Sequence, residues 1–378
     1  MRRRLLLLAA AAALGGVAFS GDRFWLQFLA KAMIGSILAM SLDLLVGFTG
    51  LVSLAHSAFF GLAAYLLAGL TNRFDLVNPV VTLPLCVAFA AACALVIGWL
   101  SLRATGVYFI MVTLAFTQML FYLFNDSPAL GGSDGLYVKA RPIEGRAAAY
   151  IAIWAAVVLV YLLLSRLLRA PYGRVLEGIR GNDQRMRSLG YPTRRYKLVA
   201  FVIAGALAGL AGYLDATLYG FVNPAQLGWR QSGLILVTVL LGGRGTLYGP
   251  ALGALLLAFI EHYGERVTDH WNALIAALVI AVVLFLPRGL AGLARISEGD
   301  PVARTLPSTR TVTESEMLKT ASMSCSTSTT VRPRATLRRS STIRSASSWP
   351  SPASGSSRRS SDGSVASIIA ISSCRCSP

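Results

Sequence analysis

The chain has 378 residues, of which 55% are hydrophobic and only 14% are charged, and its mean hydropathy is +0.61. Soluble domains carry about 25% charged residues, so this composition excludes an ordinary soluble protein and indicates an integral membrane protein. The net charge of +18 does not indicate nucleic acid binding, because it divides into +12 over residues 1–296 (24 basic, 12 acidic) and +6 over residues 297–378, a segment of different composition.

Residues 1–23 open with arginines, continue with an apolar core and end in small residues. This layout suits a cleaved signal peptide and a retained first helix alike. We favour a signal-anchor-like helix, because further spans follow at once.

Nine more apolar runs follow the first one. They occupy residues 24–46, 51–70, 80–101, 105–124, 148–168, 198–218, 231–243, 249–263 and 271–287. A helix needs about 20 residues to cross the hydrocarbon core, so we expect an all-α, polytopic transmembrane helical bundle of about ten spans. The runs at 231–243 and 249–263 are short and flanked by glycines, which predicts tilted, broken or re-entrant segments.

The longest basic loop, residues 166–197, holds nine Lys or Arg residues against Glu177 and Asp183, a net +7. Cytoplasmic loops carry the excess of Lys and Arg. Counting spans from a cytoplasmic N-terminus places this loop, Arg103 and Arg244 inside and the 125–147 loop outside. We therefore expect both termini in the cytoplasm.

A short helix is predicted within this loop. Asn182 can cap its N-terminus, Gly190 can end it in the left-handed conformation, and Pro192 prevents its continuation. Met186 and Leu189 lie three positions apart, so we expect them to share one face of the turn.

Polar side chains within apolar runs are functional candidates, because their exposure to lipid is costly. For Asp43, beside a Gly-rich break, lining of a pathway and capping of a helix end are equally favoured. For His56 a hydrogen-bonded packing role is favoured, and Thr113 and Gln118 are further candidates for a polar translocation pathway.

Other ionisable residues receive simpler interpretations. Lys31 lies near the outer end of its span and can extend its amine to the interface. Asp215 lies close to the outer end of its helix, where hydration suffices. The Glu261-His262 pair is interpreted as an interfacial, wetted pair.

Small residues recur at the spacing that lets helix backbones approach closely. These helix-packing candidates are Gly205, Gly209, Gly212, Gly249 and Gly253. Such spacing occurs in any polytopic bundle and does not by itself identify a transporter.

The motifs of soluble enzymes are missing from the sequence. It has no GxxxxGK[ST] phosphate loop, no HExxH pair and no Asp-rich metal motif. The five cysteines show no metal-site spacing and no disulfide framework, although Cys374 and Cys376 could pair. We expect no catalytic residue, no metal site and no cofactor bound by this chain.

Residues 297–378 are rich in Ser, Arg and Pro and lack apolar periodicity. A low-complexity, disordered tail is the first expectation. A hypothesis that we favour is a non-native reading frame, and contact of the basic tail with anionic lipid or nucleic acid is a weaker alternative.

Six ordered blocks carry a resemblance to a known family. They are DLLVGFTGLVSLAHSAFFGLAAY at 43–65, LRATGVYFIMVTLAFTQML at 102–120, GGSDGL at 131–136, PYGRVLEGIRGNDQRMRSLGYPTRRYKLVAFVIAGALAGLAG at 171–212, LLGGRGTLYGPALGA at 240–254 and LFLPRGLAGL at 284–293. Over roughly residues 24–296 the chain resembles the inner-membrane permeases of branched-chain amino acid ABC transporters. Two departures are Asp43, where Asn is expected, and Ala55, where Gly is usual before the histidine.

The resemblance implies an EAA-type cytoplasmic loop at residues 169–197, whose short helix docks into a groove on an ATPase subunit. Its coupling residues would be Asn182, Asp183, Gln184, Arg185, Met186, Arg187, Ser188, Leu189 and Gly190. Gln184, Arg185 and Met186 occupy the Glu-Ala-Ala positions, so the motif is degenerate.

The implied assembly contains a second related permease, two ATPase subunits that use ATP and Mg²⁺, and a periplasmic substrate-binding protein, in the bacterial inner membrane and its lipid. Branched-chain or similar amino acids would be the cargo, with urea or amides as an alternative for the same architecture. A proton-coupled secondary transporter that uses Asp43 or His56 stays open as a different class. A membrane-bound transferase is disfavoured by the missing motifs.

Overall fold

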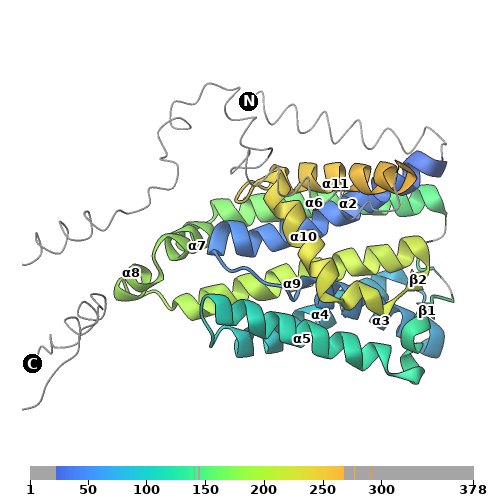
Figure 1. Ribbon diagram of the computed structural model, residues 1–378, viewed down its shortest axis with the longest axis horizontal. Coiled ribbons are helices and arrows are strands. Elements are labelled where there is room, and N and C mark those ends of the chain that lie inside the picture. Colours follow the sequence, from blue (N-terminus) through green and yellow to red (C-terminus); the bar gives the residue numbers. More distant parts are fainter. Residues whose placement is uncertain (1–22, 140, 144, 268–275, 277–289, 291–378) are drawn as a thin grey trace, which may run out of the picture. The chain divides into compact units, whose positions relative to one another are not determined.

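A computed structural model describes residues 23–139, 141–143, 145–267, 276 and 290 of the chain. The predicted first helix, the span at 271–287 and the tail at 297–378 lie outside these residues. The all-α expectation is confirmed, because nearly all of the described chain is helical (Figure 1).

The α-helices follow the chain in this order: α2 (Arg23–Asp43), α3 (His56–Phe74), α4 (Pro79–Ser101), α5 (Val107–Asn125), α6 (Arg146–Arg169), α7 (Pro171–Gly181), α8 (Asp183–Ser188), α9 (Thr193–Tyr219), α10 (Trp229–Gly242) and α11 (Tyr248–Val267). A π-helical turn, Leu44–Thr49, extends α2. Short 3₁₀ turns occupy Pro128–Leu130, Gly132–Asp134 and Pro224–Leu227. Strands β1 (Leu136–Tyr137) and β2 (Phe221–Val222) pair antiparallel, Leu136 opposite Val222.

Among the described residues, five helical segments are both long and apolar enough to cross a membrane: Phe24–Thr49, Pro79–Ser101, Val107–Asn125, Arg146–Arg169 and Thr193–Tyr219. The prediction of a short segment at 231–243 is confirmed by α10, which has 14 residues. At 249–263 the helix is longer than the apolar run, because α11 continues to Val267 and has 20 residues, but it is not among the five segments given above. Its polar end, Glu261 to Arg266, continues the helix, since Glu and Arg are good helix formers.

The second predicted run, 51–70, becomes helical only at His56, because Gly50 (φ +74°) ends the π-helical turn. The connecting backbone runs through the interior, where Leu54 N–H donates to Thr113 Oγ1 at 3.2 Å. Thr117 Oγ1 and Ser232 Oγ donate to the Leu54 carbonyl at 2.9 and 2.5 Å. Non-helical backbone at membrane depth is tolerated where protein groups satisfy it, and these three hydroxyls do so.

Contacts sort the loops into two ends of the bundle. At one end, Arg180 of α7 donates to the Gly47 carbonyl and Arg194 Nη2 donates to the Trp99 carbonyl at 3.4 Å. We call this the basic end, because the 166–197 loop, Arg103 and Arg244 belong to it. At the opposite end the β1–β2 pair lies beside α3, where Asn72 Nδ2 donates to the Tyr137 carbonyl at 2.8 Å. This separation agrees with the predicted span parity.

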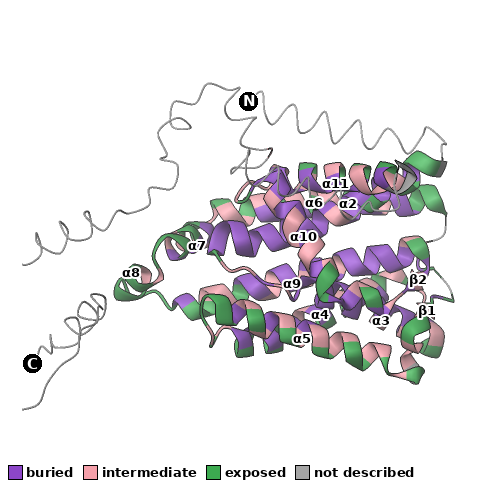
Figure 2. Cartoon of the chain, viewed as in Figure 1, coloured by how far each residue is buried: buried purple, intermediate pink, exposed green. Residues whose placement is uncertain are grey.

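Helices α2, α3 and α9 form the core of the bundle, and α4, α5 and α6 lie outside it (Figures 1 and 2). In the most apolar stretches of α4 and α5, only 28% and 17% of the residues are buried. The corresponding shares are 83% for the segment that begins with α2 and 67% for α9. Large apolar side chains on α4 and α5 are exposed, among them Phe89, Val96 and Met119. This is the surface expected of helices that face lipid.

Glycines allow α9 and α11 to approach their neighbours. A Cβ on Gly209 would lie 2.3 Å from the Ala90 Cβ, and a Cβ on Gly212 would lie 1.9 Å from the Phe60 carbonyl oxygen. In the same way Gly205 abuts Ala94, Gly253 abuts the Thr238 carbonyl, and Gly249 abuts Gly242. All five glycines that the spacing singled out therefore lie at close contacts.

Candidate functional site

Two short helices, α7 and α8, stand out beyond the ends of the longer helices at the basic end (Figure 1). Helix α6 ends at Arg169 because Ala170 is extended (ψ 163°) and Pro171 follows it as the first residue of α7. Helix α7 is strongly amphipathic and buries Gly173, Leu176 and Ile179. The sequence thus predicts one helix in this loop, where the structure has two.

The caps predicted for α8 are confirmed. The Asn182 side chain accepts a hydrogen bond from Arg185 N–H at 3.0 Å. At the other end Gly190 has φ +86°, its N–H donates to the Arg187 carbonyl, and Tyr191 N–H donates to the Met186 carbonyl. This pair of bonds is the Schellman arrangement. The N-cap alone is worth about 1 kcal/mol, which matters for a helix of six residues.

The expectation that Met186 and Leu189 form one docking face needs correction. Met186 is half-buried, and its sulfur would lie 2.8 Å from a Cβ on Gly178, so it packs α8 onto α7. Leu189 is 65% exposed. The surface of α8 that is free to meet another protein is formed instead by Gln184, Arg185, Ser188 and Leu189, which are all exposed.

Charged side chains tie α8 to the start of α9. Asp183 lies 2.7 Å from Arg187 Nη2 and 3.2 Å from Lys197 Nζ, and Arg187 Nε donates to Thr193 Oγ1 at 3.1 Å. Burial raises the pKa of the Asp183 carboxyl, but the Thr193 hydroxyl and the charges of Lys197 and Arg187 together hold that pKa below its ordinary value. The carboxylate form of Asp183 is therefore stabilised by the folded loop.

Helix α7 reaches the core through Arg180, which donates to the carbonyl of Gly47 in the π-helical turn. Next to it, Asp43 is fully buried and its Oδ1 accepts from Gly245 N–H at 2.8 Å. A Cβ on Gly47 would lie 2.3 Å from Asp43 Oδ1 and 2.5 Å from Gly245 N, so no other residue fits there. We call Asp43, Gly47, Arg180 and Gly245 the basic-end joint, in which the Asp43 side chain ties the π-helical turn to the turn before α11. The pathway and helix-end interpretations of Asp43 both stay predictions.

The other predicted pathway residues lie elsewhere. His56 is fully buried and its ring is edge-on to Phe59, 6.2 Å between centroids. This contact supports the packing role predicted for His56, and the hydrogen bond predicted with it stays a prediction. Thr113 donates to the Ile110 carbonyl and supports Leu54. Gln118 is half-buried on α5.

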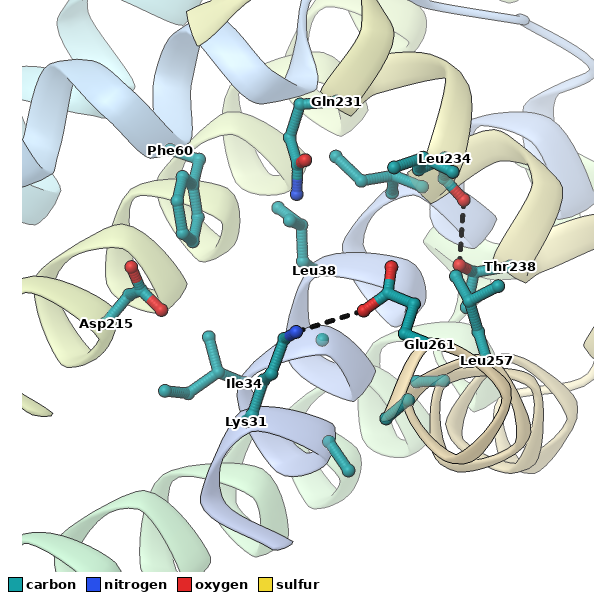
Figure 3. A pocket seen from close by; sticks show the side chains of 15 residues that line it. Lys31, Ile34, Leu38, Phe60, Asp215, Gln231, Leu234, Thr238, Leu257 and Glu261 are labelled. Atoms are coloured by element: carbon teal, nitrogen blue, oxygen red, sulfur yellow. Dashed lines mark hydrogen bonds and ion pairs between the residues drawn. The ribbon is translucent and has the colours of Figure 1, made fainter. Parts of the chain in front are cut away.

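Sequence reasoning missed a polar cluster on the other half of the bundle. Lys31 of α2 and Glu261 of α11 form an ion pair, with Nζ and Oε2 3.0 Å apart, and Asp215 of α9 and Gln231 of α10 line the same cavity (Figure 3). The separate interpretations as an interfacial lysine, a hydrated aspartate and a wetted Glu-His pair overlooked that Lys31, Asp215 and Glu261 line one cavity. Their opposite signs within three apolar spans were the available signal.

Metal ligands do not gather in the described part of the chain, where no group of three His, Cys, Asp or Glu residues could hold an ion. Cys86 and Cys93 are free thiols on α4.

A sequence profile of the family described as "Branched-chain amino acid transport system / permease component" matches residues 24–286. The high-affinity branched-chain amino acid transport system permease protein LivM of Escherichia coli K12 is 30% identical over 293 residues, which cover 70% of this chain and 69% of LivM.

Two further relatives match shorter stretches of the chain. The permease protein LivH of Salmonella typhimurium is 29% identical over 181 residues, or 47% of this chain and 56% of LivH. The autoinducer 2 import system permease protein LsrC of Escherichia coli O9:H4 is 33% identical over 138 residues, or 35% of this chain and 40% of LsrC. No solved structure matches the chain significantly.

Proposed function

Since the chain belongs to the family of permease components of branched-chain amino acid transport systems, we propose that it is the membrane-spanning subunit of an ATP-driven importer of branched-chain or similar amino acids. The observation that carries this proposal is the family match over residues 24–286, which includes both the bundle and the α7–α8 loop. The chain itself is a transport subunit and not an enzyme.

The proposed assembly has four further subunits. A second, related permease is supported by the likeness to both LivM and LivH, which are named as separate permease proteins. Two ATPase subunits would bind and hydrolyse ATP with Mg²⁺, and a periplasmic binding protein would deliver the amino acid. In this arrangement the basic end faces the cytoplasm of a bacterial cell, as the excess of Lys and Arg favours.

The ATPase would dock on the exposed surface of α8, formed by Gln184, Arg185, Ser188 and Leu189. A helix that inserts into a groove presents an apolar anchor with polar neighbours, and Leu189, at 65% exposure, is the apolar anchor here. Because Met186 fixes α8 to Gly178 of α7, a displacement of α8 moves α7 with it.

From α7 the movement would reach the core through the basic-end joint. Arg180 contacts the π-helical turn that ends α2, and Asp43 ties the same turn to Gly245 between α10 and α11. One displacement of α7 therefore acts on three helices at once. Such a joint suits a transition between outward-facing and inward-facing states.

The docking proposal is tested with the variant Arg185→Glu/Leu189→Ser, co-expressed with the partner permease, the ATPases and the binding protein. We expect both the ATPase that co-purifies and amino acid uptake to fall by about tenfold or more, because an anchor and a charge are lost from the interface. The matched control is Arg146→Glu, an equal charge change on an exposed residue at the opposite end. Undiminished co-purification in the double variant would contradict docking at α8.

A further inference from the structure

The cavity around Lys31 lies between five helices of the described bundle. Its volume is about 120 Å³, and its walls come from α2, α3, α9, α10 and α11. Figure 3 shows Lys31, Gln231 and Glu261 pointing toward a common space, with Asp215 and Phe60 on its other side. Lys31, Asp215, Gln231 and Glu261 thus come from four different helices.

Lys31 follows Arg23, the first residue of α2, by eight positions, which is about 12 Å along the helix axis. Its side chain is 55% exposed and that of Glu261 is 16% exposed. A half-exposed ammonium at this depth is costly against hydrocarbon and is expected where a span faces water or protein. The open side of the cavity is therefore polar, since a half-exposed ammonium and its carboxylate partner border it.

The charges in the cavity restrict what it can hold. Lys31 opposes a simple cation, and the two carboxylates of Asp215 and Glu261 oppose a simple anion. A ligand that carries one ammonium and one carboxylate satisfies both signs together. The remaining walls are apolar, with Phe60, Ile34, Leu38 and Leu257 among them, which suits an aliphatic side chain.

We propose that this cavity is a binding station for a zwitterionic amino acid with an aliphatic side chain on its way through the membrane. Lys31 and Gln231 bind the ligand carboxylate, and Glu261 and Asp215 bind its ammonium. This proposal rests on the function proposed above, and it adds the residues that recognise the cargo inside the permease.

The Lys31–Glu261 ion pair holds the station closed when it is empty. The ligand's carboxylate replaces Glu261 beside Lys31, and the ligand's ammonium replaces Lys31 beside Glu261, so that both partners of the opened ion pair regain an opposite charge. The Asp215 Oδ2 atom accepts a hydrogen bond from Gln226 Nε2 at 3.2 Å, which orients this carboxylate.

The size of the cavity agrees with a small ligand. A protein cavity of about 150 Å³ holds benzene, so about 120 Å³ suits a ligand of similar or slightly smaller size. Separation of Lys31 from Glu261 enlarges the space at its open side, where Lys31 is 55% exposed. Larger aliphatic amino acids then fit after the ion pair opens.

The test is initial uptake of radiolabelled leucine, isoleucine and valine by cells that express the whole transporter. We expect Lys31→Met, Glu261→Gln and Asp215→Asn each to lower kcat/KM for uptake by about tenfold to a hundredfold, as for a lost hydrogen bond to a charged group. Lys31→Arg should retain uptake, because it keeps the charge. Lys139→Met is the control, since Lys139 is exposed after β1 and does not line the cavity.

The double variant Lys31→Met/Glu261→Gln separates a binding role from a structural one. Removal of both partners of a merely structural ion pair is close to neutral, so recovery of wild-type uptake in the double variant would overturn the proposal. Binding predicts that its uptake stays at or below that of the single variants. Asp215→Asn keeps the acceptor for Gln226, so its folding is preserved and its uptake alone can overturn the proposal if it equals that of the wild type.

Two outcomes keep this proposal distinct from the proposed function. If the wild-type transporter takes up none of the three amino acids, the proposed function fails first. If the wild type takes them up and the cavity variants have unchanged kcat/KM, only the binding station fails. ATP hydrolysis stimulated by the loaded binding protein should persist in the cavity variants, because α7 and α8 are unaltered.

Discussion

The carboxylate of Asp43 accepts a hydrogen bond of 2.8 Å from the backbone N–H of Gly245, which lies 202 residues further along the chain. The bond closes the π-helical turn after α2 onto the turn between α10 and α11, and Arg180 of α7 contacts the same turn. Asp43, which stands where the family pattern has Asn, thus has a partner in Gly245 that the sequence does not indicate.

The variant Asp43→Asn should keep uptake within about twofold of the wild type, since Asn offers the same acceptor oxygen. Asp43→Leu leaves the buried Gly245 N–H without an acceptor, at a cost of about 1–3 kcal/mol, and should lower the unfolding temperature and uptake together. Uptake assays and thermal unfolding in detergent measure both effects. Loss of uptake in a stable Asp43→Asn protein would instead favour a proton-carrying role.

The variant Arg180→Ala removes the contact between α7 and the Gly47 carbonyl. We expect uptake to fall by about tenfold, the usual effect of losing a hydrogen bond from a charged group, while the ATPase still co-purifies because α8 is intact. The measurement is amino acid uptake per ATP hydrolysed in proteoliposomes. Arg174→Ala, an exposed arginine on the same helix, is the control. Equal uptake per ATP hydrolysed in the two variants would show that the contact of Arg180 with Gly47 does not transmit movement from α7.

Replacement of Gly212 by Ala should destabilise the bundle, because the new Cβ would lie 1.9 Å from the Phe60 carbonyl oxygen. Overpacking of this kind costs about 1–3 kcal/mol. The same change at Gly69, where nothing lies within 4 Å, should be neutral or slightly stabilising. The difference in unfolding temperature between the two variants is the measurement, and equal temperatures would show that α9 and α3 are not in close contact.

The pKa of the Asp183 carboxyl is lowered in the folded loop. A lowered pKa contributes stability that is present above the unfolded value, about 3.9, and is lost as the pH falls through the folded value. Amide hydrogens of Asp183–Leu189 should therefore exchange faster below about pH 4 after correction for intrinsic exchange. Asp183→Asn should show the faster exchange already at pH 7, and unchanged exchange in that variant would exclude the Arg187 and Lys197 pairs as stabilising contacts.

Much of the fold could be predicted because membrane helices obey simple rules of length and hydropathy. The apolar runs at 80–101, 105–124 and 148–168 differ from α4, α5 and α6 by a few residues at most. The caps of α8 were equally accessible, since Asn182, Gly190 and Pro192 act on residues within one or two turns. Helix caps can be predicted because they depend only on residues that are close in the sequence.

The parts that could not be predicted depend on contacts between distant segments. The helix at 51–70 begins late because Thr113, Thr117 and Ser232 hold Leu54 in a non-helical conformation. Met186 turned out to pack on Gly178, which spacing along one helix cannot show. The Lys31–Glu261 pair joins residues 230 positions apart, so each residue seemed an isolated interfacial charge.

The six-residue helix α8 is closed at both ends by its own neighbours, from Asn182 to Tyr191. Its backbone conformation therefore does not depend on which side chains occupy its outward surface, and Gln184, Arg185 and Leu189 are free to vary without disturbing the bundle. A segment of this kind can be exchanged as a cassette. If residues 182–191 are grafted from one transporter onto another, the specificity for the ATPase subunit should be transferred. The substrate specificity of the membrane domain should stay unchanged.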